Sequence, residues 1–243
     1  MTDIFLLSMR QLAGKWRLIV MLALGALPVI NAAVALAFNS DVGPAEIDIV
    51  LINGMLTGAI MPLIVLAVAS AAFANEVEDR TLSNLTLTPV PRWGIVAPKL
   101  LATIAVSAPV PVMSGVASLA MMMSAAGEDG TGKSAVALGV GVFVGVAVYS
   151  AVFVWAGLLS TRALGFGLLY VFLWEGLFSS FVSGIRYLSI RQYVIGIIHG
   201  IDGSRFAETQ NLLSFPVAAA MAALVFGLFA ALAVRRLRTM DVP

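Results

Sequence analysis

The sequence predicts an all-α polytopic membrane protein that forms a single transmembrane domain over residues 1–243. Hydrophobic residues make up 60% of the chain and charged residues only 11%, and the mean hydropathy is +1.02. A soluble domain is about 45–50% apolar and about 25% charged, because its surface needs polar cover. The few charges are also unevenly spaced, since long stretches hold none. The lipid bilayer is therefore the expected solvent, and the net charge of +1 gives no reason to expect nucleic-acid binding.

Each stretch with no charge, or with a single one, is long enough to form a membrane-spanning helix. About 20 apolar residues cross the hydrocarbon core as a helix, and backbone groups in lipid have to be satisfied within the segment. Only one of the stretches holds a charge, Glu175. Six spans are predicted, at about 18–38, 51–74, 100–124, 135–159, 163–183 and 212–234.

The basic residues predict the orientation of these spans. With the N-terminus inside, six spans place both termini in the cytoplasm, together with ten of the 14 basic residues. This excess satisfies the positive-inside rule. The cytoplasmic set is Arg10, Lys15, Arg17, Arg80, Arg92, Lys99, Arg162, Arg235, Arg236 and Arg238; the outer set is Lys133, Arg186, Arg191 and Arg205.

The longest predicted cytoplasmic connection, between spans two and three, begins with a cluster of acids. Asn75 is a suitable N-cap for a short helix, and the acids after it suit the positive end of that helix. Pro89 and Pro91 are expected to end the helix and turn the chain. The acids are Glu76, Glu78 and Asp79, and the expected anchors at the re-entry into the membrane are Arg92, Trp93 and Lys99. An ordinary helical hairpin loop is the alternative interpretation.

This connection resembles a known signature. The run Glu-x-Glu-Asp-Arg-Thr-Leu-x-x-Leu from Glu76, followed by Thr-Pro-x-Pro-Arg-Trp-x-x-Val-x-x-Lys, is similar to the segment between helices two and three of ABC type-2 transporter permeases. Two departures are Arg80, where many members have Gly, and Pro98, where Gly precedes the Lys. The resemblance implies a coupling helix within 75–91 that docks on a cytoplasmic ATPase. Its candidate docking residues are Glu76, Glu78, Asp79, Arg80, Thr81, Leu82 and Leu85.

The same resemblance implies the rest of the architecture and the function. Residues 2–15 would be an elbow helix lying at the membrane surface, and re-entrant helices would lie between spans five and six. The chain would be the non-enzymatic permease subunit of an ABC exporter in a bacterial or archaeal plasma membrane. It would pair with a second copy or a paralogue and bind two ATPase subunits, which hold ATP and Mg while this chain holds no cofactor. An ion-gradient-driven secondary transporter and a non-transporting assembly subunit remain as alternatives.

The predicted outer segment 184–211 contains a short amphipathic helix. Its apolar residues recur at helical spacing, and Ser189 is placed to cap its start. The helix is too short to span, so it is expected to be re-entrant or interfacial, with a surface-lying helix as the alternative. The stripe is Ile190, Tyr193, Val194, Ile197, Ile198 and Ile201. Glu175, Arg186 and Tyr193 are the candidate gate or path residues, with local capping or pairing as the alternative role of Glu175.

Three further patterns lead to expectations about packing and binding. Residues 127–134 fit the letters of a phosphate-binding loop, but they join two predicted spans rather than a strand and a helix, so nucleotide binding is not expected. Gly141 and Gly145 permit close helix contact, and Asn31 and Asn53 are expected to hydrogen-bond between helices. With a single histidine and no cysteine, no metal site is expected.

Overall fold

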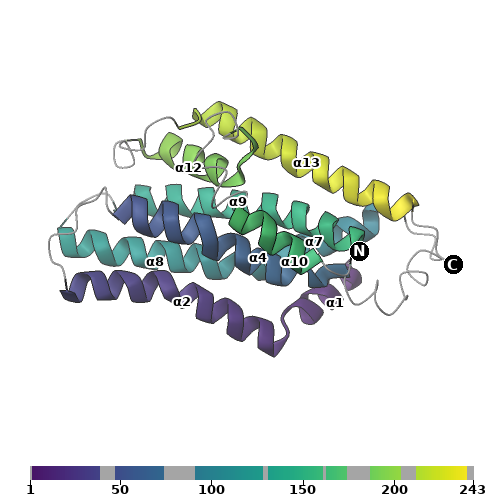
Figure 1. Cartoon of the computed structure of the whole chain (residues 1–243), viewed down its shortest axis with the longest axis horizontal. Coiled ribbons are helices and arrows are strands. Elements are labelled where there is room, and N and C mark those ends of the chain that lie inside the picture. The colour runs from purple at the N-terminus through teal and green to yellow at the C-terminus, as the bar shows by residue number, and fades with distance from the viewer. Residues whose placement is uncertain are drawn as a thin grey trace.

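The computed structural model describes residues 2–38, 47–73, 91–127, 131–160, 163–173, 187–203 and 212–239, and these residues are almost entirely helical (Figure 1). The helices are α1 (Thr2–Leu12), α2 (Lys15–Phe38), the π-helix η1 (Ile47–Ile60), α4 (Met61–Ala69), α7 (Trp93–Ser107), α8 (Pro109–Ala126), α9 (Thr131–Leu159), α10 (Ala163–Leu169), α12 (Ile190–Ile201) and α13 (Phe215–Thr239). The all-helical class predicted from the sequence is therefore confirmed for the described residues.

Five helical stretches within the described residues are long and apolar enough to cross a membrane. They are Lys15–Phe38, Leu51–Phe73, Trp93–Ala125, Thr131–Leu159 and Phe215–Thr239. Each contains most or all of one predicted span. Of the predicted span 163–183, only the shorter apolar helix Leu164–Leu173 belongs to the described part of the chain, and the rest lies outside it.

Prolines divide two of the long stretches. The third stretch changes from α7 to α8 at Ala108, and Pro109 opens the second helix. The second stretch changes from η1 to α4 at Met61, where Pro62 occupies the first turn. Proline has no backbone N–H to bond back to the preceding turn, so a change of helix at these points is expected. Pro28, by contrast, lies inside the continuous helix α2.

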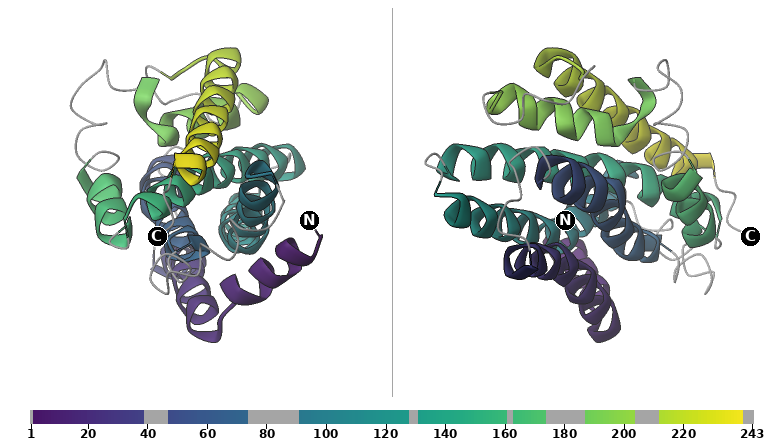
Figure 2. Two further views of the ribbon diagram at one scale, coloured as in Figure 1. Left: turned by 90° about the vertical axis from the view of Figure 1, so that its right-hand side faces the viewer. Right: turned by 60° about the vertical axis from the view of Figure 1, so that its left-hand side comes forward.

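The helices form an elongated bundle around α9. That helix packs against α4, α8, α12 and α13, while α2 packs against α8 and α1 packs against α7. The end-on view in Figure 2 shows α2 and α13 on opposite sides of the bundle. These two helices are also the least buried of the five candidate spans. Their free apolar faces are therefore the surfaces left for lipid or for another helix.

The two ends of the bundle differ in charge. The starts of α1, α2 and α7 and the last turns of α13 gather at one end, to the right in Figure 1, which we name the basic end. Its described charges include Arg10, Lys15, Arg17, Arg92 and Arg236. The other end carries the close of α8, the start of α9 and the end of α12, and we name it the opposite end.

Candidate functional site

The two chain ends that flank the predicted coupling segment lie at the basic end of the bundle. The structure describes the chain up to Phe73 and again from Pro91. All seven candidate docking residues, Glu76 to Leu85, lie outside the described residues, as do Glu175 and Arg186. The described neighbourhood of the segment is therefore formed by the last turn of span two, the start of α7 and the helix α1.

Lys99 joins these two chain ends. Its side chain is only 3% exposed, and its ammonium Nζ donates a hydrogen bond to the carbonyl oxygen of Ala72 at 2.6 Å. The same nitrogen lies 4.4 Å from the centroid of the Phe73 ring, in a cation–π contact. A lysine near the C-terminus of a helix interacts well with the last carbonyls and with the helix dipole. The predicted role of Lys99 was a membrane-surface anchor, but the structure buries it between α7 and the end of span two.

The other two predicted anchors lie nearer the surface. Arg92 is half-buried and precedes α7, where its carbonyl accepts the N–H of Val96 at 3.1 Å. Trp93 is 53% exposed at the first position of the helix. A tryptophan and an arginine at the start of a membrane-spanning helix occupy the positions expected for interfacial anchors.

The N-terminal helix α1 braces α7 from the other side. Leu12 and Ser8 of α1 are buried against the bundle, whereas Leu7 is 70% exposed. The turn into α2 is held by Arg17, whose Nη1 donates to the carbonyl of Gln11 at 3.0 Å. A helix therefore forms where the elbow helix was expected, and it packs on the helix that follows the coupling segment.

At the opposite end, α12 runs alongside α9 in the reverse direction. Ser189 caps it as predicted, accepting the N–H of Gln192 at 3.4 Å. Asp202, after its end, contacts Ser134 near the start of α9, whereas Val194 reaches Gly145. Gly145 lies roughly 21 Å along a helix that is roughly 43 Å long, at 1.5 Å per residue. The helix therefore enters the bundle to about half its depth, instead of lying flat across its end.

Glycines on α9 allow this close contact. A Cβ at Gly141 would clash with Ile198, and one at Gly145 would lie 2.5 Å from Cγ2 of Val194 and 2.8 Å from the sulfur of Met61. The predicted small-residue face of α9 is confirmed, and within this chain it receives α12 and α4. The buried stripe of α12 also includes Ile195, which helical spacing alone did not identify.

Arg191, predicted on the outer side, is half-buried and binds η1. Its Nε donates to Oδ1 of Asn53 at 2.8 Å, and its guanidinium lies 3.6 Å from where a Cβ of Gly58 would be. Asn53 therefore makes the interhelical hydrogen bond predicted for it. Asn53 belongs to the π-helix η1, where the hydroxyl of Thr57 donates to the carbonyl of Ile52. Ionisable groups within spans and π-helical turns are both frequent at functional sites.

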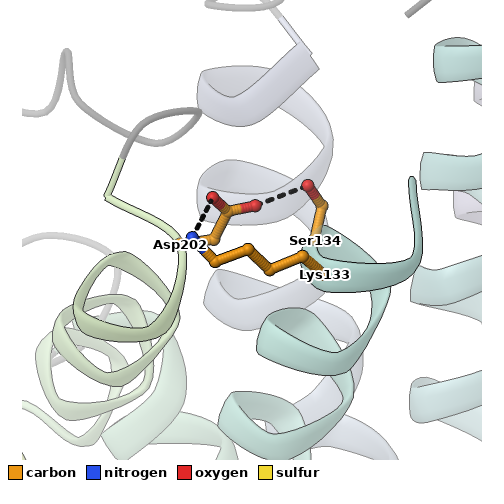
Figure 3. Close-up of polar contacts among 3 residues, drawn as sticks. All are labelled: Lys133, Ser134 and Asp202. Atoms are coloured by element: carbon orange, nitrogen blue, oxygen red, sulfur yellow. Dashed lines mark hydrogen bonds and ion pairs between the residues drawn. The ribbon is translucent and has the colours of Figure 1, made fainter. Parts of the chain in front are cut away.

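A second polar contact joins the C-terminal end of α12 to the start of α9 (Figure 3). The carboxylate of Asp202, which is 3% exposed, accepts the hydroxyl of Ser134 at 2.6 Å and lies 3.5 Å from the ammonium of Lys133. We name these three residues the outer latch, after the side on which the sequence predicts Lys133. Lys133 and Ser134 are the last two letters of the phosphate-loop pattern, and here they bind a carboxylate of the same chain. No local pattern in the sequence pairs Asp202 with them.

Tyr193, the one predicted gate residue that the structure describes, is buried on α12. Its hydroxyl donates to the carbonyl of Tyr187, just before the helix begins. Elsewhere on α12, an apolar hollow of about 280 Å³ lies between α9, α12 and α13. The side chains that line the hollow include Phe143, Ile197 and Phe226, so it suits an apolar group rather than a charged one.

Comparison with known proteins identifies the family. A family model described as ABC-2 family transporter protein matches residues 14–176, which is more than half of the chain. The match includes α2 to α10 and the predicted coupling segment, whereas α12 and α13 follow it. No curated protein matches the chain. The chain belongs to the ABC-2 family of transporter membrane proteins, and its apolar helices are those of a multi-pass permease subunit that works with an ATP-binding partner.

Proposed function

We propose that this chain forms the translocation path of an ABC exporter as one half of a permease dimer, driven by two separate ATPase subunits. The observation that carries the proposal is the family match over residues 14–176, which includes the acidic segment between span two and α7. ATP is hydrolysed in the partner subunits, and this chain converts their movement into a change of its own helices.

The basic end of the bundle is the cytoplasmic end in this proposal. The described basic residues at the starts of α1, α2 and α7 and in the last turns of α13 support it, because cytoplasmic ends of spans are enriched in Lys and Arg. The segment 74–90 then leaves and re-enters the membrane on the side where ATP is available. Its acids Glu76, Glu78 and Asp79, with Arg80, Thr81, Leu82 and Leu85, form the proposed docking surface for the ATPase.

The mechanism requires an element that both ends bias between two arrangements. Closure of the ATPase dimer moves the docking segment, and span two and α7 carry this movement into the bundle because the segment joins them directly. At the other end, α12 lies along α9 for about half the length of α9. The outer latch holds it to α9, and the Arg191–Asn53 bond holds it to η1. Withdrawal of α12 is the movement that would open the path to the outside.

The free face of α2 supports pairing with a second copy. Asn31 lies in the second half of this apolar helix and is exposed, together with Leu27, Ile30 and Val34. An amide in lipid gains from a partner, and asparagine can both donate and accept a hydrogen bond. A second α2 packed on this face would satisfy both amides. An Asn31→Cys chain, which has no other cysteine, should therefore form a disulfide-linked dimer, visible by electrophoresis.

The docking proposal is tested by purifying the chain with the ATPase encoded beside it. Replacing Glu76 and Asp79 together by alanine should abolish complex formation, because the acids would contact the ATPase directly. The matched control replaces Glu128 and Asp129, two acids predicted on the outer side, and should leave the complex intact. An unchanged complex and unchanged ATP hydrolysis in the Glu76 and Asp79 variant would remove the coupling assignment.

A further inference from the structure

The buried ammonium of Lys99 is the most unusual polar contact at the basic end. Removing a charged group from water is costly unless it gains strong partners. Lys99 is 3% exposed, and its ammonium contacts the carbonyl oxygen of Ala72 and the ring of Phe73. The backbone carbonyl of Lys99 also accepts the hydroxyl of Thr103 at 2.8 Å. A buried ammonium at this place in the fold therefore calls for an explanation.

The position of the contact supplies one. Ala72 lies just before the end of the described part of span two, and Lys99 lies six residues into α7. The hydrogen bond therefore joins residues 27 apart in the chain, across the base of the segment 74–90. Phe73 adds the ring contact on the same side. These contacts therefore join the two chain ends that flank the segment, where α4 and α1 also pack against α7.

We infer that Lys99 is a positioning residue that presents the segment 74–90 to its partner. The inference rests on the proposed function, because it assumes that this segment docks on an ATPase. A segment whose two ends are fixed loses less conformational entropy on binding than one whose ends move apart. The clamp also transmits force: a push on the segment moves the end of span two and the start of α7 as one unit, instead of splaying them.

The clamp itself is tested on the full chain in lipid nanodiscs by hydrogen exchange. Lys99→Met keeps the length and the apolar stem but removes the ammonium, so the amides of residues 66–73 should exchange at least tenfold faster. Lys99→Arg keeps a donor and a positive charge and should restore most of the protection. The control Lys133→Met changes the lysine of the outer latch and should leave residues 66–73 unaffected. Unchanged exchange in the Lys99→Met chain would overturn the inference.

The consequence for the partner is measured as the affinity of the ATPase for the chain in nanodiscs. Lys99→Met should weaken binding about tenfold, Lys99→Arg should restore it, and Phe73→Leu, which removes only the ring contact, should weaken it less. If Lys99→Met cannot be purified as a folded chain, Lys99→Arg and Phe73→Leu are tested instead. A Phe73→Leu chain with both wild-type affinity and wild-type hydrogen exchange would contradict the clamp.

The two proposals fail differently in this experiment. If the Glu76 and Asp79 substitutions leave ATPase affinity unchanged, the docking segment is wrongly assigned and the proposed function fails. If those substitutions abolish binding while Lys99→Met binds with wild-type affinity, the docking segment stands and the positioning role of Lys99 is wrong. A loss of thermal stability with unchanged ATPase affinity would also overturn the inference, because it would show a purely structural lysine.

Discussion

Two lysines at opposite ends of the bundle hold helices together in different ways. Lys99 is buried and binds a backbone carbonyl and a ring, so its contact is shielded from water. The side chain of Lys133 is 62% exposed, and it pairs with the buried carboxylate of Asp202, which also accepts a hydrogen bond from Ser134. Exposed ion pairs are weak and screened by salt, whereas shielded polar contacts are not. The difference suits the proposed mechanism, in which the basic end moves as a unit and the opposite end opens.

The largest effect is expected from Asp202, the acceptor of the outer latch. Asp202→Ala leaves the buried hydroxyl of Ser134 without its partner and should lower the stability of the closed α12 by about 2 kcal/mol. Hydrogen exchange of the α12 amides measures this change. Asp202→Asn is the matched control, because its amide oxygen still accepts from Ser134 and should preserve part of the protection. Equal exchange in all three chains would show that the latch does not hold α12.

A comparable effect is expected where α12 crosses the glycines of α9. Gly145→Ala adds a Cβ 2.5 Å from Val194, and overpacking of this kind costs about 1–3 kcal/mol. The variant should unfold at a lower temperature in detergent and should expose α12. Gly132→Ala, on the same helix with no atom within 4 Å of the added Cβ, is the control and should be close to neutral. If both variants behave alike, the close contact between α9 and α12 is not real.

A smaller effect is expected for the hydrogen bond between Arg191 and Asn53. A double-mutant cycle of Arg191→Met and Asn53→Leu should give a coupling energy of about 1 kcal/mol, within the range measured for hydrogen bonds between membrane helices. Thermal unfolding of the four chains supplies the values. If the losses of stability in the two single variants simply add up in the double variant, the two side chains do not interact in the membrane. That result would weaken the contrast between the basic end and the opposite end.

The smallest effect is expected from Lys133. Because most of its side chain is exposed, Lys133→Met should change stability by less than about 1 kcal/mol. The loss should shrink further as salt rises, since the ion pair is screened in the wild type. Unfolding at low and high ionic strength tests both points. A large loss of stability that does not depend on salt would show that Lys133, like Lys99, makes a contact shielded from water. The contrast between the two ends would then disappear.

Much of the fold follows from local features of the sequence. Gaps between charges predicted five stretches that the structure shows as long apolar helices, and the spacing from Ile190 onwards with Ser189 predicted α12 and its cap. The acidic segment and its resemblance predicted the family that the match over residues 14–176 confirms. These features are local because helix formation, capping and hydropathy each depend on residues within a few turns.

The contacts of the candidate site could not be predicted in this way. Lys99 carries the same charge as a surface anchor, and only the nearness of Ala72 and Phe73 shows that it is buried. Arg191 was predicted on the outer side from the order of the spans, and only the structure shows its bond to Asn53, which is 138 positions away. The partners of Asp202 are likewise distant, 68 residues away in the case of Ser134.

The sequence by itself determined that this chain lives in a membrane, where most of its spans lie, and which family it belongs to. Those conclusions depend on composition, periodicity and a short motif, all of which are readable along the chain. Only the tertiary structure decided how α12 enters the bundle and which charges are buried. The physical reason is that a charge is stable in an apolar interior only beside specific partners, and folding brings those partners together from distant parts of the chain.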